Sequence, residues 1–276
     1  MSIQFTAHNH KYTSLESDGI DWLSATSFIS NFKKPFDADT IAAKSAKNKK
    51  SKWYGMSEED IKAAWKAEAL RATTLGTWYH NCREADICEL HDIERQGETI
   101  EVFKPIEKDG IKYAPEQKLK DGIYPEHMVY LKSAGLCGQS DLVEVIKGVV
   151  HITDYKTNKE IKVEGFKSWN GVAKMDKPLS HLDDCNLNHY AMQLSLYMYM
   201  ILKHNPKLKP GILTLHHVLF DEVGKDKYGN PVTALDSSGN PIVKDVVQYD
   251  VPYLKQEVIS CLHWLEDNRH KLKAKD

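Results

Sequence analysis

Two β-rich segments, residues 136–146 and 149–156, constrain the fold of this chain more than any other feature. They are joined by a Lys-Gly pair at 147–148, and a two-residue connection of this kind is typical of a tight β-hairpin. Such a turn fixes which residues of the two strands face each other. It predicts that Asp141 lies directly opposite Asp154.

Opposed residues on paired strands have Cβ atoms about 4.5–5.5 Å apart, so the carboxylates of Asp141 and Asp154 repel each other unless a cation or a proton lies between them. Mg²⁺ or Mn²⁺ would remove the conflict, because these hard cations favour carboxylate oxygens. Lys156 should point to the same face as Asp154. Val150 and Ile152 share that face, which predicts that it is buried. The alternative is an exposed edge on which Asp154 and Lys156 form an ordinary surface ion pair.

The other segments predict an α/β fold in a single domain, with a small mixed central sheet flanked by helices. Strands are expected at residues 126–131, 212–220 and 246–249, and helices after Ser24 or Thr26 and at residues 57–70, 75–90, 188–203 and 252–271. A hairpin is expected at residues 10–22, and a protruding β-ribbon at 221–245, where two Gly-Asn-Pro turns occur. The resulting parts are an N-terminal hairpin and helical part (1–70), a core (71–220), the ribbon, and a C-terminal strand and helix (246–276).

Residues 75–90 are expected to bury a stripe that contains Trp78, Cys82 and Ala85. His80 and Glu84 share another face of this helix. Glu84 lies four residues after His80 and could orient it or bind a metal ion through water, although an exposed acid is equally compatible with the spacing.

Composition restricts the class of protein. The chain has 276 residues, 41% of them hydrophobic. It lacks the apolar run of about 20 residues that a membrane span requires, and it has no recognisable secretory signal. We therefore expect no membrane partner and a cytoplasmic location, in the host if a phage encodes the protein. The five cysteines contain no CxxC pair. The net charge of −2 predicts that most of the protein surface is not basic. A run of lysines at 44–52, including Lys49, Lys50 and Lys52, precedes Trp53-Tyr54. Such a run would suit binding of a DNA backbone, with an aromatic ring available for base stacking. A solvated loop is the alternative.

Three motifs together resemble a known family. Gly138-Gln139-Ser140-Asp141 followed by Asp154-Tyr155-Lys156 is similar to the central motif of RecB-like nucleases of the PD-(D/E)XK superfamily. Gly76-Thr77-Trp78-Tyr79-His80 resembles the GTxxH helix of that branch, and Gln193 with Tyr197 resembles its QxxxY helix. The order along the chain also agrees, over about residues 24–220. Ser140 replaces the nominal proline, and the second acid is Asp154 rather than glutamate.

The resemblance implies a restriction-endonuclease-like core and a role for each residue. Asp141, Asp154, His80 and the Tyr155 backbone carbonyl would hold Mg²⁺ or Mn²⁺. Glu126 would supply a further catalytic acid, for a second metal ion or for positioning water. Lys156 would position the attacking water or stabilise developing charge. Supporting roles, in substrate binding or in hydrogen bonding to Lys156, fall to Gln193, Tyr197, Glu84, Lys49, Lys50 and Lys52. On spacing alone Tyr197 could equally belong to the core.

The expected activity is that of a DNA exonuclease acting on single strands or duplex ends, in replication, recombination, repair or phage DNA processing. The alternatives are a structure-selective endonuclease, a non-catalytic DNA-binding protein of the same fold, and a zinc hydrolase built on His80 and Glu84, which lacks the paired histidines of HExxH enzymes. No cysteine arrangement for an iron-sulfur cluster is present. No Walker A motif occurs, so unwinding would need a helicase or recombination partner.

Overall fold

The central sheet is built on the predicted hairpin. In the computed structural model, β9 (Leu136–Ile146) and β10 (Val149–Lys156) have the expected bounds. Lys147 and Gly148 have φ values of +51° and +72°, as in the tight turns that suit the twist of a hairpin. The two strands pair in the predicted register as far as Thr153, opposite Leu142.

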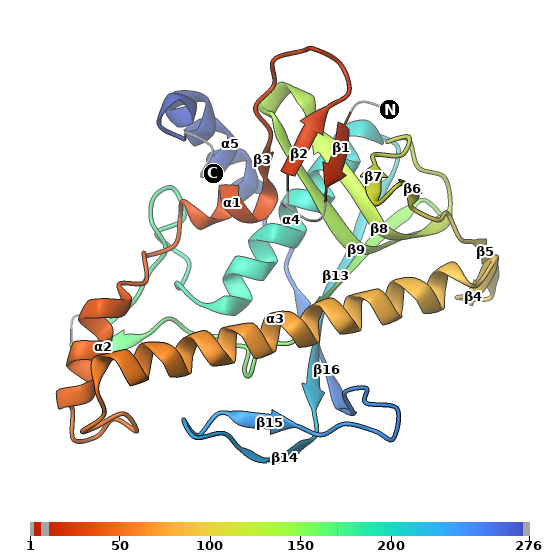
Figure 1. Cartoon of the computed structure of the whole chain (residues 1–276). Coiled ribbons are helices and arrows are strands. Elements are labelled where there is room, and N and C mark those ends of the chain that lie inside the picture. Colours follow the sequence, from red (N-terminus) through yellow and green to blue (C-terminus); the bar gives the residue numbers. More distant parts are fainter. Residues whose placement is uncertain (1–2, 7–10, 170, 273–276) are drawn as a thin grey trace.

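Four further strands complete this mixed sheet (Figure 1). β13 (Lys209–Phe220) runs parallel to β10, and β16 (Val243–Val251) pairs antiparallel with β13. β8 (Gly122–Leu131) pairs antiparallel with β9, while β3 (Leu23–Ser24) runs parallel to the start of β9. The chain reaches β13 from β10 through α4 (Asn186–His204), because parallel neighbours require a long crossover connection.

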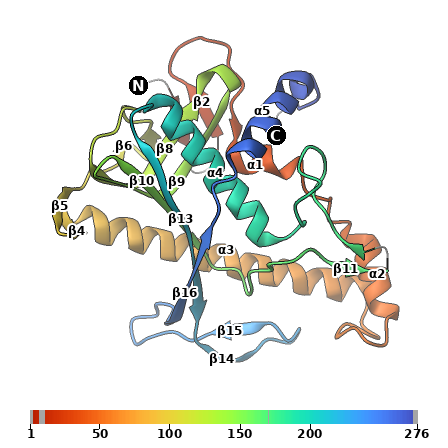
Figure 2. The ribbon, with the colours of Figure 1, turned by 180° about the vertical axis from the view of Figure 1, so that it is seen from behind.

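Helix α4 crosses one face of the sheet, and α1 (Ala25–Ser30) and α5 (Lys255–Asn268) pack beside it (Figure 2). The main hydrophobic core lies between these helices and the strands. Val150 and Ile152 are fully buried in it, and Asp154 is 2% exposed. The prediction that this face of β10 is buried is therefore confirmed.

A single helix, α3 (Glu58–Cys88), replaces the two helices expected at 57–70 and 75–90. Ser57 is its N-cap, because Ser57 Oγ accepts a hydrogen bond of 3.0 Å from the Asp60 backbone N–H. The helix continues through the polar stretch after Leu70, where the Thr73 hydroxyl donates to the Ala69 carbonyl at 2.9 Å.

The buried stripe of α3 differs from the predicted one. Leu75 and Tyr79 pack against Tyr155 and against β13, whereas Ala85 is exposed and Trp78 only half-buried. The reason is that α3 meets the sheet at an oblique crossing (Figure 1), so different turns of the helix present different sides to it.

The hairpin predicted at residues 10–22 does not form among the described residues, and its first residue, His10, lies outside them. β2 (Lys11–Ser14) pairs with β1 (Ile3–Thr6) instead. Residues 15–22, which include Gly19 with φ +65°, lead from β2 into β3 (Leu23–Ser24).

The β-ribbon exists but does not protrude freely. β14 (Glu222–Lys225) pairs with β15 (Pro231–Thr233). Asn230 Nδ2 donates to the Ala64 carbonyl of α3 at 3.0 Å, and Tyr228 packs against the hydrophobic cluster between α2 (Ala38–Lys47) and the start of α3. The ribbon is therefore anchored on α3.

The structure describes residues 3–6, 11–169 and 171–272. Among these residues no helix combines the length and the apolar character needed to cross a membrane. The remaining elements are short and lie around the sheet: α2 (Ala38–Lys47), β4 (Asp92–Arg95), β5 (Glu98–Glu101), β6 (Ile106–Lys108), β7 (Ile111–Tyr113), β11 (Lys167–Ser168), β12 (Gly171–Val172), and two 3-10 turns at Lys132–Ala134 and Arg269–Lys271.

Candidate functional site

The candidate site forms where one edge of β9 loses its strand partners. β8 pairs along one edge of β9, but on the other edge β10 pairs only as far as Leu142, and β3 pairs only with the first two residues. The Asp141 side chain lies at the end of the β10 pairing, where its Oδ2 accepts a hydrogen bond of 2.7 Å from the Tyr155 backbone N–H. One carboxylate oxygen of Asp141 is thus held by the backbone.

Helix α3 brings His80 to this opening. A Cβ atom at Gly76, one turn earlier, would lie 3.1 Å from Thr157 Oγ1, so the missing side chain lets the helix approach the end of β10 closely. The Thr157 hydroxyl donates to the Ala72 carbonyl at 2.9 Å and ties the two elements together. His80 Nε2 donates to the Tyr155 carbonyl at 3.1 Å, since a carbonyl only accepts. His80 Nδ1 is left to face the carboxylates.

Glu126 provides a second carboxylate from β8. Its φ of +47° interrupts the pairing with β9 between Pro125 and His127. Residues other than glycine rarely adopt this conformation, and such strained positions concentrate at functional sites. Gln139 Nε2 holds the Glu126 carboxylate with a hydrogen bond of 2.6 Å. Gln139 was not among the predicted site residues, although its place two residues before Asp141 puts it on the same face of β9.

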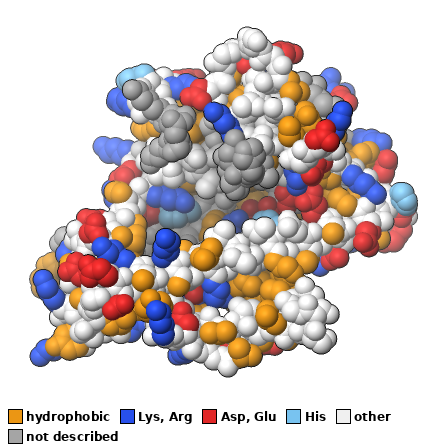
Figure 3. All heavy atoms as spheres, viewed as in Figure 1, with side chains coloured by type: hydrophobic (Ala, Val, Ile, Leu, Met, Phe, Trp, Pro, Cys, Tyr) orange, Lys and Arg blue, Asp and Glu red, His pale blue; other side chains and the backbone are white. Residues whose placement is uncertain are grey.

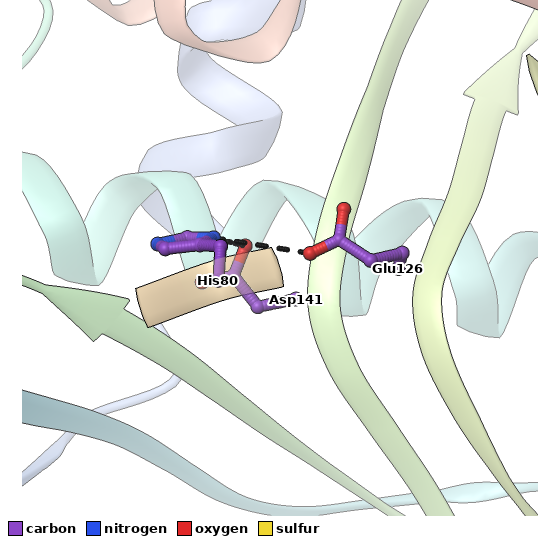
Figure 4. Close-up of side chains that lie close together, drawn as sticks. All are labelled: His80, Glu126 and Asp141. Atoms are coloured by element: carbon purple, nitrogen blue, oxygen red, sulfur yellow. Dashed lines mark ion pairs between the residues drawn. The ribbon is translucent and has the colours of Figure 1, made fainter. Parts of the chain in front are cut away.

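His80, Glu126 and Asp141 form a cluster in which one ligand atom from each lies within 4.8 Å of the others (Figure 4). His80 Nδ1 is 3.5 Å from Asp141 Oδ1 and 3.8 Å from Glu126 Oε1. Octahedral ligands at about 2.1 Å from a cation lie about 3.0 Å apart when adjacent and about 4.2 Å apart when opposite. The three donors therefore fit a single divalent cation after small side-chain movements, and the imidazole favours Mn²⁺ over Mg²⁺.

The electrostatics of the cluster follow from two acids and a histidine that are held close together with little solvent around them. Burial, reinforced by the nearby Asp154 carboxylate, raises the pKa of Asp141 to about 7. Burial would lower the pKa of His80, but Glu126 and then Asp141 outweigh it and raise that pKa to about 9. A cation bound here would have to displace the proton of His80, so binding should release protons.

Asp154 lies beside this cluster but outside it. Its buried carboxylate forms an ion pair with the Lys156 ammonium, which is 17% exposed. The Lys156 Nζ also lies 4.9 Å from the centre of the Tyr190 ring, whose hydroxyl donates to Asn158 Oδ1 at 2.7 Å. Burial lowers the pKa of Lys156, but Asp154 and then Asp141 outweigh this effect and raise it, so the lysine is charged. Tyr190 was missed by the sequence analysis.

Gln193 and Tyr197 lie on α4, the helix that packs against the sheet carrying the site. Gln193 Nε2 donates to the Tyr197 hydroxyl at 3.0 Å, and Tyr197 is 3% exposed. A Cβ atom at Gly138 would lie 2.6 Å from the Tyr197 ring, which explains the glycine in this motif. Tyr197 therefore packs as a core residue against β9. Tyr190, seven residues before Tyr197 and so on the same side of α4, is the residue that contacts Lys156.

Glu84 contacts a lysine rather than His80. Both of its carboxylate oxygens accept hydrogen bonds of 3.0 Å from Lys112 Nζ, on β7. The same ammonium lies 3.9 Å from Glu126 Oε2, so it also offsets part of the negative charge of the cluster. Nothing in the spacing of the sequence indicates Lys112, because a separate small sheet carries it to the site.

The lysine run lies at the N-terminal end of α3, whereas His80 lies in the C-terminal half of that helix (Figure 1). Lys49, Lys50 and Lys52 are exposed. Trp53 is not available for base stacking as expected, because it is buried against Trp65 and covered by Lys52 Nζ at 4.0 Å. The space-filling view shows a furrow along α3 in which acidic, basic and histidine side chains meet (Figure 3).

Comparisons of the chain with family models, with curated proteins and with solved structures found no match.

Proposed function

We propose that this chain is a metal-dependent nuclease that hydrolyses phosphodiester bonds in DNA, with the restriction-endonuclease-like core that its motifs resemble. The observation that carries the proposal is the convergence of His80, Glu126 and Asp141 within 4.8 Å, next to the ion pair of Asp154 and Lys156. These groups come from α3, β8, β9 and β10. Two acids, a histidine and a charged lysine around one opening suit the hydrolysis of an anionic ester.

In the proposed reaction, His80, Glu126 and Asp141 would hold Mg²⁺ or Mn²⁺. When bound, the cation would supply charge that polarises the phosphodiester and lowers the pKa of water. Lys156, held in place by Asp154, orients the attacking water or stabilises the negative charge that develops on phosphate. The water oxygen bonds to phosphorus as the bond to the 3′ oxygen breaks, and a proton passes to that oxygen. The resemblance implies these products, a 5′-phosphate and a 3′-hydroxyl.

The test of activity compares the wild type with Asp141→Asn and Lys156→Met on labelled single-stranded and duplex DNA, with Mg²⁺, Mn²⁺ or EDTA. We expect cleavage only with metal, and a loss of about 100-fold or more in each variant. Lys207→Met, at an exposed lysine after α4, is the matched control and should cleave normally. Cleavage in EDTA, or full activity in both site variants, would sink the proposed centre.

Metal binding can be tested without any reaction. Mn²⁺ should raise the melting temperature of the wild type, because a ligand that binds only the folded state stabilises it. Glu126→Gln should lose this shift, and Asp154→Asn should keep more of it, because Glu126 belongs to the three-residue cluster and Asp154 does not. The opposite ranking would assign the ligand role to Asp154.

We further propose that the enzyme is an exonuclease for DNA replication, recombination, repair or phage DNA processing. Linear and closed circular DNA separate the alternatives, because an exonuclease requires an end. Cleavage of circles would identify an endonuclease. Binding of DNA without cleavage in any metal would identify a non-catalytic protein of this fold.

A further inference from the structure

The two carboxylates of the candidate metal cluster each present a single oxygen to the place where a cation would bind. Glu126 Oε1 and Asp141 Oδ1 face His80 Nδ1, at 3.8 Å and 3.5 Å. The other oxygen of Glu126 is turned away from His80 (Figure 4). These second oxygens matter because a site for two metal ions, which lie about 3.5–4 Å apart, needs a carboxylate that gives one oxygen to each ion.

Both second oxygens already have partners in the protein. Asp141 Oδ2 accepts a hydrogen bond of 2.7 Å from the Tyr155 backbone N–H. Glu126 Oε2 accepts one of 2.6 Å from Gln139 Nε2 and lies 3.9 Å from Lys112 Nζ. The backbone N–H and the amide are uncharged, but the ammonium is a cation on the side of Glu126 where a second metal ion would have to bind. Like charges at this distance repel each other.

The Lys112 ammonium is held in this place from several directions. Lys112 lies in the middle of β7, where it pairs with Phe5 of β1 and with Glu107 of β6. Its Nζ donates to both carboxylate oxygens of Glu84, each at 3.0 Å. The side chain is only 20% exposed, so solvent and salt screen its charge less than that of a surface lysine.

One divalent cation would balance the charges of the whole site. Lys112 neutralises Glu84, as Lys156 neutralises Asp154. The two carboxylates that remain are those of the cluster, and their negative charges match a single divalent cation. Among the described residues the cluster contains no third carboxylate that would offset a second cation.

We propose that the Lys112 ammonium takes the place of a second metal ion, so that this protein binds one divalent cation, and that Lys112 is a positioning residue that holds Glu126 with a single oxygen toward that cation. This inference rests on the metal centre of the proposed function and deepens it. Replacement of Lys112 by an uncharged residue would free Glu84 and Glu126 Oε2 to bind a second cation.

The test counts the Mn²⁺ ions bound per chain without DNA, by titration with Mn²⁺ and electron paramagnetic resonance of the free ion. We expect one ion for the wild type and two for Lys112→Met, with the second ion between Glu84 and Glu126. The spectrum of the bound ions is a second readout. A lone Mn²⁺ keeps its ordinary hyperfine pattern, whereas two ions about 3.5–4 Å apart couple and split the lines more finely.

Three further variants serve as controls. Lys108→Met, at an exposed lysine of β6 in the same small sheet, should bind one ion. Lys112→Arg keeps the positive charge and should also bind one. Lys112→Met/Glu84→Gln removes a ligand of the additional site and should return the count from two to one. Melting temperatures in EDTA check that each variant folds, and Lys112→Gln replaces Lys112→Met if the latter does not fold.

The outcomes separate this inference from the proposed function. A wild type that cleaves DNA but binds two Mn²⁺ ions overturns the role of Lys112 and leaves the nuclease standing. A folded Lys112→Met variant that binds one ion as tightly as the wild type also overturns it. If the wild type binds one ion and Lys112→Met binds two, but no metal supports cleavage, the nuclease proposal fails and the role of Lys112 stands.

Discussion

Replacement of Gly138 by alanine should destabilise the protein by crowding Tyr197. The new Cβ would lie 2.6 Å from Tyr197 Cε1, closer than real Cβ atoms approach other atoms, and 3.1 Å from the Tyr197 hydroxyl oxygen, which is a tight contact. The ring is buried and cannot swing into solvent, so β9 or α4 must shift. Overpacking of this kind costs about 1–3 kcal/mol. Gly138 has no positive φ, so alanine also recovers about 0.4–1 kcal/mol from the unfolded chain, which leaves a net loss of about 0–2.6 kcal/mol, centred near 1 kcal/mol.

The assay is urea denaturation of a double-mutant cycle in EDTA. Tyr197→Leu alone should cost about 2 kcal/mol through the cavity that it leaves. In that background Gly138→Ala should cost little, because the ring that it meets is gone, which gives a coupling energy of about 1 kcal/mol or more. Additive losses in the cycle would refute the explanation that the glycine exists to admit the tyrosine ring.

Three further predictions concern stability. Lys156→Met should lower the free energy of unfolding in EDTA by about 3–5 kcal/mol, because it leaves the Asp154 carboxylate buried without its partner. In urea denaturation, Asp154→Leu/Lys156→Met should lose clearly less than the sum of the two single changes, and additive losses would contradict this prediction. Burial, with His204 nearby, lowers the pKa of His127 from 6.5 to about 4. The contribution of neutral His127 to the free energy of unfolding is therefore complete above about pH 6.5 and falls by about 3 kcal/mol as the pH drops to 4. Urea denaturation midpoints between pH 7 and 4 should fall less steeply in His127→Gln than in the wild type, and an unchanged pH dependence would contradict this prediction. Ser57→Ala should cost about 1 kcal/mol by removing the N-cap of α3, measured by thermal melting, and no loss would mean that the cap is replaced by water.

Local physical rules account for the parts of the fold that could be predicted. The bounds and register of β9 and β10 follow from alternation and from a two-residue turn, both of which act between residues close in the chain. The buried face that carries Asp154 follows from the apolar residues beside it. The N-caps at Ser24 and Ser57 likewise need only the next three residues.

Parts that depend on distant segments could not be predicted. Whether α3 continues through its polar stretch or ends there is set by packing against the sheet and the ribbon rather than by helix propensity. β1 and β2 pair with each other, although a nearer turn suggested another partner for β2. Trp53 faces the core because Trp65 lies beside it.

The candidate site shows the same division. The sequence by itself determined that Asp141, Asp154 and Lys156 share one hairpin, because strand periodicity acts over a few residues. The choice of His80 and Glu126 as site residues rested on the family resemblance. Only the tertiary structure decided that Glu126 joins His80 and Asp141 while Asp154 pairs with Lys156, and that Lys112 arrives from a separate sheet. The physical reason is distance: which charges share a site depends on the end of the β9–β10 pairing and on the closeness of α3 at Gly76, and these depend on contacts between segments that lie far apart in the chain.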